Sequence, residues 1–432
     1  MKRLFSFFFL VLLFASFTHA QQDHGILWRH SALTGIQIQP AHLIGTDTFS
    51  ELMIFGFQGS VDNDHLYLEK LFNKSGWRLP NGATSTENQD QSTRSASMQL
   101  NVPLPGFLIS KGNYAFGAQL AVRSELQLDA ASQDIASLTA FGFDQPRFFN
   151  RALREDNLSG RLLAWGELKA HFSKLVYEKI GHRLTVGTNA KLLRGMGGLQ
   201  LNAPGSDYMV LSKDELMFFD TPGSYHYSDN LNRLDQDNTA KGAWGAGIDL
   251  GIQYTYQPTG WSAPKFRVGL SLLDLGQINF ANSTRHDVVA DGYWNVEEVP
   301  INHLEVFRDT ILFRYGGNLR PESLSMNLPT RLSFQSAIWY NAFWHTDILA
   351  EFNLVGNENQ IQGRNRYQVT TMWEKKKIGV AIPIGYNNWQ GFQSGLFVRF
   401  GRVQLGTQHL PNWLARKTRT GADIYGAFIL NW

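Results

Sequence analysis

The chain has 432 residues, of which 13% are aromatic and only 18% are charged, with 39 Lys and Arg against 37 Asp and Glu. A nucleic-acid partner would require a clustered basic face, and this balanced charge argues against one. The sequence contains no cysteine, which excludes thiol chemistry, disulfides and cysteine-based metal sites.

Residues 1–20 have the pattern of a secretory signal peptide. Lys2 and Arg3 precede an apolar run from Leu4 to Phe17, and the segment ends in the small residue Ala20. The apolar run is shorter than the roughly 20 residues that a membrane-spanning helix needs. We therefore expect cleavage near Ala20, which would remove two basic residues and leave a mature chain of zero formal charge. No cysteine follows this point, so a lipoprotein anchor is excluded.

Residues 21–48 form the next segment, which is mixed in character and contains Pro40. It precedes the first predicted strand. If the strands that follow close into an outer-membrane barrel, we expect this N-terminal segment to cap the periplasmic mouth of the barrel or to enter its lumen as a plug.

Alternation of apolar and other residues recurs along the rest of the chain. Residues 244–256 (WGAGIDLGIQYTY) are apolar at every even position and small or polar at every odd one. Runs of this kind exceed the usual strand length of about 5–6 residues and suit the 9–11 residues of a tilted strand that crosses a bilayer. The pattern predicts strands at residues 49–58, 95–102, 113–126, 161–175, 182–193, 242–256, 265–275, 330–340, 346–355, 367–373, 377–385, 394–400, 403–408 and 421–432.

The connections between these strands alternate between long and short. This asymmetry is typical of transmembrane barrels, which have short periplasmic turns and long extracellular loops. We therefore predict an all-β fold in which residues 49–432 form an antiparallel outer-membrane barrel of about 14 strands (a range of 12–16), with both termini periplasmic. Residues 276–329 are long enough to contain a further hairpin. The predicted loops are 59–94, 127–160, 194–241, 276–329, 356–366, 386–393 and 409–420.

Aromatic residues gather near the short turns, where a membrane interface is expected. The chain also ends in an alternating strand that closes on Trp432 and resembles the C-terminal recognition strand of bacterial outer-membrane proteins. The interfacial candidates are Phe172, Tyr177, Tyr254, Tyr256, Tyr340, Phe343, Trp344, Trp373 and Trp432.

The alternation also predicts which charges face the lumen. If even positions face lipid, the lumen receives a nearly balanced mixture of signs, and an ion-selective pore would instead carry a ring of one sign. We expect lumenal ion pairs and a hydrated or partly plugged interior. The predicted lumenal residues are Arg123, Glu125, Glu167, Lys169, His171, Lys191, Asp249, Arg267, Arg331, Gln335, Asp347, Glu351, Asn353 and Asp423.

Motifs for catalysis, cofactor binding or metal binding are not evident. The sequence has no HExxH, Walker A, GxSxG or EF-hand pattern. Residues 195–198 (GMGG) and 245–247 (GAG) are glycine-rich, but close strand packing or turning explains them better than phosphate binding. Residues 62–64 (DND) lack the later glycine and glutamate of a calcium loop. We predict no cofactor, while a catalytic Ser–His pair stays open as an alternative.

Five segments carry a resemblance: residues 39–41 (QPA), 62–63 (DN), 189–195 (NAKLLRG), 247–254 (GIDLGIQY) and 270–276 (LSLLDLG). Together they resemble a family of uncharacterised outer-membrane proteins from Bacteroidota. The resemblance covers nearly the whole mature chain, although residues 39–41 (QPA) depart from the Asn-Pro-Ala of that family. It implies a barrel in the outer membrane and supplies no catalytic residues. More distantly, the chain is similar to fourteen-stranded fatty-acid-transporter-type barrels and to barrels associated with type IX secretion.

The leading functional hypothesis is a non-enzymatic, porin-like barrel. It would either transport small or hydrophobic solutes or act as a structural component of a surface or secretion complex, with membrane lipid and periplasmic or surface proteins as partners. One alternative is a soluble secreted β-sandwich that acts as a binding module, because sandwiches also alternate. Another is an outer-membrane hydrolase.

Overall fold

A computed structural model of the chain describes residues 28, 31–42, 49–63, 66–68, 85–87, 93–141, 144–233, 242–295, 317–354, 360–361, 363, 365–387, 391–411 and 421–431. The predicted signal peptide and its cleavage site lie outside these residues. No helix in the described part of the chain has the length and apolar character needed to cross a membrane.

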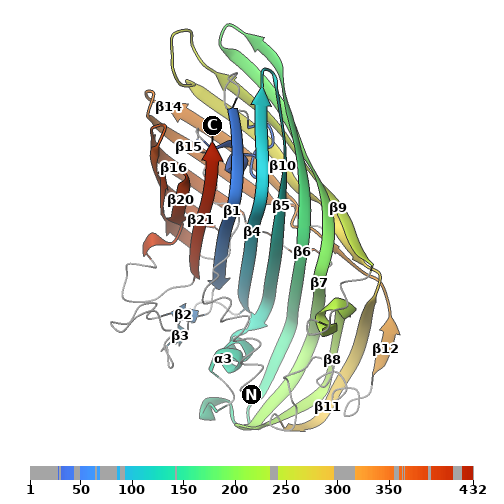
Figure 1. The fold of residues 1–432 in the computed structure, drawn as a ribbon. Coiled ribbons are helices and arrows are strands. Elements are labelled where there is room, and N and C mark those ends of the chain that lie inside the picture. Colours follow the sequence, from blue (N-terminus) through green and yellow to red (C-terminus); the bar gives the residue numbers. More distant parts are fainter. Residues whose placement is uncertain are drawn as a thin grey trace.

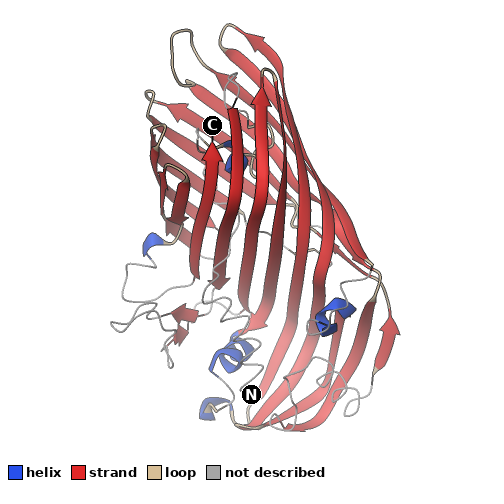
Figure 2. Cartoon of the chain, in the orientation of Figure 1, coloured by secondary structure: helices blue, strands red, loops and turns tan. Residues whose placement is uncertain are grey.

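Fourteen strands form one closed antiparallel barrel (Figures 1 and 2). The ring closes where β21 pairs with β1, with Glu51 opposite Asn431. Each of the fourteen predicted strands overlaps one of these strands, so the predicted fold class is confirmed. In ring order they are β1 (Phe49–Asn63), β4 (Thr93–Lys111), β5 (Tyr114–Ser132), β6 (Ala152–Lys179), β7 (His182–Ser212), β9 (Ala243–Tyr256), β10 (Phe266–Phe280), β14 (Arg331–Trp339), β15 (Trp344–Asn353), β16 (Arg366–Glu374), β17 (Ile378–Asn387), β19 (Leu396–Phe400), β20 (Val403–Thr407) and β21 (Gly421–Asn431).

The two ends of the barrel differ. Short turns such as Gly112–Asn113 and Ile180–Gly181 lie at one end, the upper end in Figure 1, which we call the short-turn end. At the opposite end the wall extends further along β6 and β7, which are 28 and 31 residues long. The remaining elements are α2 (Ala32–Gly35), β2 (Leu66–Leu68), β3 (Ser85–Glu87), α3 (Gln133–Phe141), η1 (Pro146–Phe148), β8 (Glu215–Ser228), η2 (Asp229–Arg233), β11 (Ser283–Asn295), β12 (Asn318–Pro321), β13 (Leu324–Asn327) and β18 (Gly391–Ser394).

The interpretation of residues 127–160, 194–241 and 276–329 as loops was wrong in large part. β6 and β7 stay paired as far as Ala152 and Met209, and β8, β11 and β12 continue this sheet beyond the ring. The sequence of these extensions does not alternate in apolar character, as at residues 208–211 (YMVL), so they lacked the pattern used to find strands. The region 276–329 does contain the additional strands that its length suggested.

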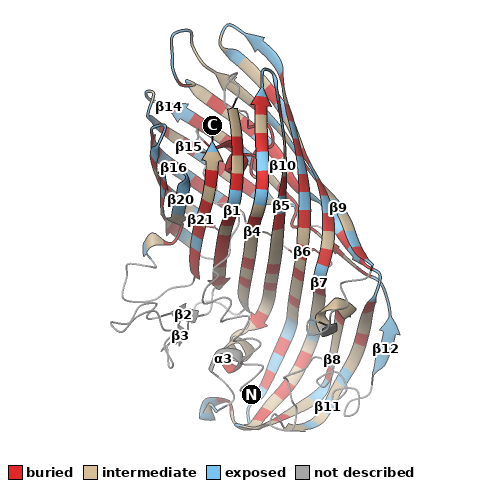
Figure 3. Cartoon of the chain, in the orientation of Figure 1, coloured by how far each residue is buried: buried red, intermediate tan, exposed pale blue. Residues whose placement is uncertain are grey.

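The two faces of the wall follow the alternation (Figure 3). Large apolar side chains are exposed on the outer face, among them Leu120, Leu168 and Ile382. Polar side chains such as Gln253, Ser271 and Gln335 are buried on the inner face. This arrangement, apolar outside and polar inside, is that of a barrel whose surroundings are lipid.

One interruption breaks the wall between β1 and β4. Their pairing stops after Met53 and Gly106 and resumes at Gln58 and Asn101. Pro103 and Pro105 lie in the gap on β4, and proline has no backbone N–H to donate to a ladder. A small cavity lies beside this gap, lined by wall residues that include Gly56 and Pro103 and by Thr34, Gln37 and Ile38 of the N-terminal segment.

Candidate functional site

Residues 31–42, here called the plug, lie inside the barrel near its short-turn end. Ala32, Leu33, Gln39 and Ala41 are all 0% exposed. The plug begins with the single turn of α2, whose first two backbone N–H groups, on Ala32 and Leu33, donate to the carboxylate of Glu51 at 3.0 and 2.8 Å. The segment predicted to cap the barrel or enter it therefore lies in the lumen over these residues.

The plug is hydrogen-bonded to strands around the ring. Asn189 on β7 donates to the carbonyl of Ile36 at 3.0 Å, and Ser271 on β10 donates to the carbonyl of Ile38 at 2.9 Å. On the opposite side, Gln404 of β20 donates to the Ser31 hydroxyl at 2.9 Å. Because these bonds come from strands on opposite sides of the barrel, the plug spans the lumen.

Gln39 makes the most contacts in the plug. Its side-chain amide donates to Gln335 Oε1 at 2.8 Å and to the backbone carbonyls of Ile252 and Leu270 at 3.3 and 3.4 Å. Its Oε1 accepts from the backbone N–H of Ala41 at 3.0 Å. The side chain of Gln39 thus joins three wall strands, β9, β10 and β14.

Glycine residues form the part of the barrel wall against which Gln39–Ala41 lie. A β-carbon at Gly187 would collide with the carbonyl of Pro40, and one at Gly251 or Gly269 would collide with the Gln39 side chain. Gly187 and Gly251 are direct register partners on β7 and β9. The missing side chains leave the space in which the plug lies against the backbone.

Deeper in the lumen, four cations and four carboxylates form one cluster around Asp274. Arg123 from β5 reaches across the barrel and binds both Asp274 oxygens, at 2.8 and 3.2 Å. Lys191 lies 2.6 Å from Asp274 and 2.5 Å from Asp249. Arg331 approaches Asp274 at 3.6 Å. These contacts tie β5, β7, β9, β10 and β14 together through buried ion pairs.

The acidic side of this charge cluster is completed by two glutamates. Glu125 lies 3.1 Å from Arg123, while Glu167 lies 3.7 Å from Arg123 and 3.4 Å from Lys169. Seven residues predicted to face the lumen therefore meet in one place. They are Arg123, Glu125, Glu167, Lys169, Lys191, Asp249 and Arg331.

Asp274, at the centre, was not among the predicted lumenal residues. Its even number predicted a lipid-facing side chain, but the β9–β10 register shifts between Leu272 and Leu275. Asp274 has a φ of 55°, and its backbone N–H donates to Asp249 at 2.7 Å. This bulge turns the side chain inward. The available signal was a single carboxylate in the row of β10 side chains that the alternation placed toward lipid, because a charge that faces lipid is costly.

The other predicted lumenal residues are held in separate contacts. Arg267 lies 3.7 Å from Asp347, and Glu351 lies 2.7 Å from Arg366. Asp423 accepts from the Thr407 hydroxyl at 2.7 Å and from the backbone N–H groups of Gln408 and His409. Gln335 is bound by the plug, and the Asn353 side chain accepts from the backbone N–H of Gly363 at 2.8 Å.

His171 lies in a chain of side-chain hydrogen bonds that reaches the plug. Its Nδ1 is 2.7 Å from Asn189 Oδ1, and its Nε2 is 3.2 Å from the hydroxyl of Ser173. Asn189 uses its amide group to donate to Asp249 and to the plug carbonyl of Ile36. A Ser–His–Asn order is also that of a nucleophilic triad. Here Ser173 and Asn189 are 0% exposed, so no substrate reaches the hydroxyl, and the chain links wall and plug.

His42 ends the plug beside the guanidinium of Arg267, with 3.4 Å between Nδ1 and Nη1. Burial, together with the positive charge of Arg267, lowers the pKa of His42 from 6.5 to about 3. The imidazole is therefore neutral in the docked plug. Within the described residues, no three His, Asp or Glu side chains converge to hold a metal ion.

Comparison with solved structures gives low similarity. The toluene transporter TodX of Pseudomonas putida is similar over 96% of this chain and 99% of its own, with 10% identity and a TM-score of 0.42. The outer-membrane protease OmpT of Escherichia coli is similar over 89% of this chain and 95% of its own, with 8% identity and a TM-score of 0.21. A Pseudomonas aeruginosa FadL homologue is similar over 89% of both chains, with 7% identity and a TM-score of 0.19.

No curated protein sequence matches the chain. The model of a family described as "Family of unknown function (DUF5723)" matches residues 40–407. This range begins within the plug and covers most of the barrel, including every residue of the charge cluster. The chain therefore belongs to the DUF5723 family of unknown function.

Proposed function

We propose that this protein is an outer-membrane transport barrel for small or hydrophobic solutes, closed in its resting state by its own plug. The observation that carries the proposal is the plug itself, which lies in the lumen and is hydrogen-bonded to strands on opposite sides of the ring. Wall side chains alone fill a barrel of about 8 strands, whereas a wider one leaves a lumen that something else must occupy.

The outer-membrane location is supported by the two faces of the wall. Exposed apolar side chains cover the outside, and aromatic rings with nearby lysines border the short-turn end, as where Lys375 lies 5.2 Å from the ring of Phe343. Such rims are typical of a lipid–water interface. We propose that the signal peptide is cleaved near Ala20 and that the short-turn end faces the periplasm. Recovery in the soluble periplasmic fraction, with no heat-dependent shift on a gel, would contradict this location.

The contacts of the plug favour a gate over a permanent filler. It is held by hydrogen bonds and close backbone packing, which can break and reform without chemistry. The balanced charge cluster gives no preference for one sign of ion, which favours uncharged or hydrophobic solutes.

Planar-bilayer conductance and solute uptake into liposomes test the gate. We expect the full chain to conduct rarely and a variant without residues 31–42 to conduct continuously. The variant must still show the heat-dependent gel shift of a folded barrel. A folded but silent deletion variant would overturn the proposal.

A scaffold in a surface or secretion complex is the second candidate. One observation favours it: β8, β11 and β12 extend the wall, and an apolar cluster that includes Phe148, Tyr208 and Val210 packs against this extension. A scaffold predicts no conductance with or without the plug, and stable co-purification with periplasmic or surface proteins.

A further inference from the structure

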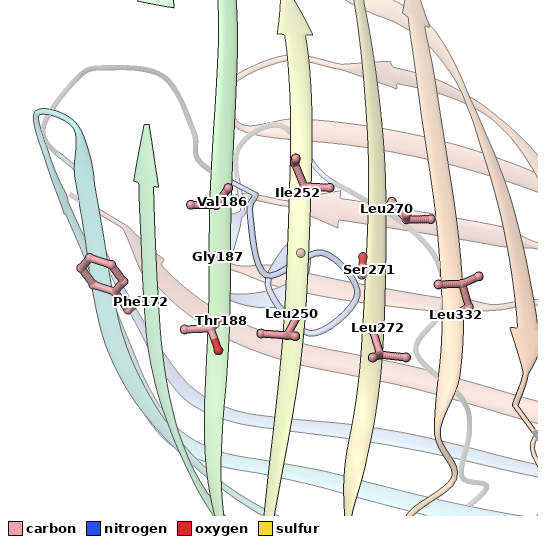
Figure 4. A pocket seen from close by; sticks show the side chains of 11 residues that line it. Phe172, Val186, Gly187, Thr188, Leu250, Ile252, Leu270, Ser271, Leu272 and Leu332 are labelled. Atoms are coloured by element: carbon pink, nitrogen blue, oxygen red, sulfur yellow. The ribbon is translucent and has the colours of Figure 1, made fainter. Parts of the chain in front are cut away.

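An apolar groove of about 460 Å³ crosses the outer face of the barrel near the short-turn end (Figure 4). One side of the groove is the outward row of Val186, Ile252 and Leu270, which are register partners on β7, β9 and β10. The other side is the row of Thr188, Leu250 and Leu272. With Phe172 on β6 and Leu332 on β14, the groove crosses five strands, or about 19 Å at about 4.8 Å per strand.

The floor of the groove is backbone. Gly187, Gly251 and Ser271 lie in register between the two rows, and their inner side is the surface that holds the plug. Figure 4 shows the outward side chains in front and the N-terminal segment behind these strands. Because the plug supports the floor from inside, the groove is already formed before anything occupies it, which lowers the cost of binding.

A cation lies just beyond one end of the groove. Lys174 follows Phe172, which lines the groove on β6, by two residues, and it is the register partner of Val186 on β7. Its Nζ lies 5.3 Å from the centre of the ring of Tyr114, the register partner of Lys174 on β5. Further along the same rim, Lys265 Nζ lies 4.7 Å from the ring of Trp261. Ammonium groups beside interfacial aromatic rings stand at the level of lipid headgroups and attract anionic ones.

From this placement we infer that the groove is a binding site for an anionic phospholipid, with an acyl chain between the two rows and the phosphate beside Lys174. The inference rests on the proposed membrane location. Bulk lipid tails are as apolar as the groove, so selectivity comes from shape and from the charge at Lys174 rather than from the hydrophobic effect. A soluble apolar ligand has no reason to require that charge.

The absence of cysteine makes a local test possible, because Leu332→Cys provides a single labelling site at the end of the groove. A fluorophore is attached to this cysteine, and the protein is placed in bilayers that contain phosphatidylglycerol or phosphatidylcholine with brominated acyl chains. The quenching of the fluorescence by the bromine atoms is then measured. We expect brominated phosphatidylglycerol to quench at about fivefold lower mole fraction, the effect of one basic residue near the membrane surface.

Two variants and two matched controls separate the groove from the rest of the wall. Val186→Trp fills the groove and Lys174→Glu reverses the charge, so each should abolish the preference. Val369→Trp on β16 changes an outward valine outside the groove, and Lys377→Glu changes a lysine in another turn, so both should keep it. Equal quenching by the two lipids, or a preference that survives Val186→Trp, would overturn the inference.

Conductance is recorded with the plug-deleted protein in bilayers of the same lipids, while the lipid preference is measured on the full-length chain. A silent deletion variant together with a full-length protein that prefers phosphatidylglycerol would reject the transport proposal and support the groove. A conducting deletion variant together with a full-length protein without a lipid preference would reject the groove and support transport.

Discussion

The carbonyl oxygen of Pro40 lies so close to the α-carbon of Gly187 that no β-carbon fits between them. The plug and the wall therefore touch through their backbones at this point, and the methyl group of an alanine at position 187 would occupy the space of the Pro40 carbonyl. Gly187 also belongs to the floor of the outer groove, so its backbone separates the groove from the plug.

Replacing Gly187 with alanine should release the plug and leave the barrel intact. Overpacking of a filled site costs about 1–3 kcal/mol, so the open fraction should rise about 5- to 150-fold. Planar-bilayer recording measures this fraction. Gly166→Ala is the matched control, because the nearest atom to its β-carbon is 4.0 Å away. Equal conductance of the two variants would contradict the role assigned to Gly187.

Replacing Asp274 with asparagine should destabilise the whole barrel. The substitution leaves Arg123, Lys191 and Arg331 buried without their shared partner, and breaking such a pair costs about 3–5 kcal/mol. The midpoint of thermal unfolding, followed by the loss of the fast-migrating band on a gel, measures the effect.

Asp144→Asn, at an exposed position, serves as the control for Asp274 and should leave the midpoint unchanged. Adding Arg123→Met to Asp274→Asn should recover part of the loss, since it removes one of the unpaired charges. A double variant as unstable as the sum of two independent losses would argue against a shared cluster.

Acid should open the plug. The pKa of His42 is 6.5 when free and about 3 when docked, so the docked state binds fewer protons. Docking stability is therefore constant above about pH 6.5 and falls as the pH drops from there towards 3. The groups around the imidazole are Arg267, His171, Gln253 and the backbone of Trp28.

Proton uptake by His42 alone should raise the open fraction about thirtyfold between pH 7.5 and pH 5, measured from single-channel records of the wild type relative to His42→Gln. His42→Gln cannot take up a proton, so its open time should vary much less over the same interval. If this variant responds to acid as strongly as the wild type, another group controls the response.

Amide exchange should be fast in β1 where it faces the two prolines of β4. Residues 54–57 lie in the interruption of the β1–β4 ladder, so the N–H groups directed at β4 lack their strand partner there. Hydrogen-exchange mass spectrometry of this stretch, compared with the continuous β6–β7 pairing at residues 166–175, measures the difference. Pro103→Val together with Pro105→Val should slow this exchange, and an unchanged rate would mean that the prolines are not the cause.

The sequence by itself determined the strands of the ring and the two faces of its wall. Both follow from alternation with a period of two, which is local: a residue such as Leu250 or Asp249 faces out or in according to its neighbours along the chain. The mixed charge of the inner face follows from the same rule.

Only the tertiary structure decided what those inner residues do. Arg123 and Asp274 are 151 residues apart, and their meeting depends on ring closure and on a one-residue bulge that reverses the face of Asp274. The plug likewise fits because Gly187, Gly251 and Gly269, separated along the chain, come into contact with Gln39–Ala41. A bulge or a glycine changes the local pattern very little, while it decides which distant groups can touch.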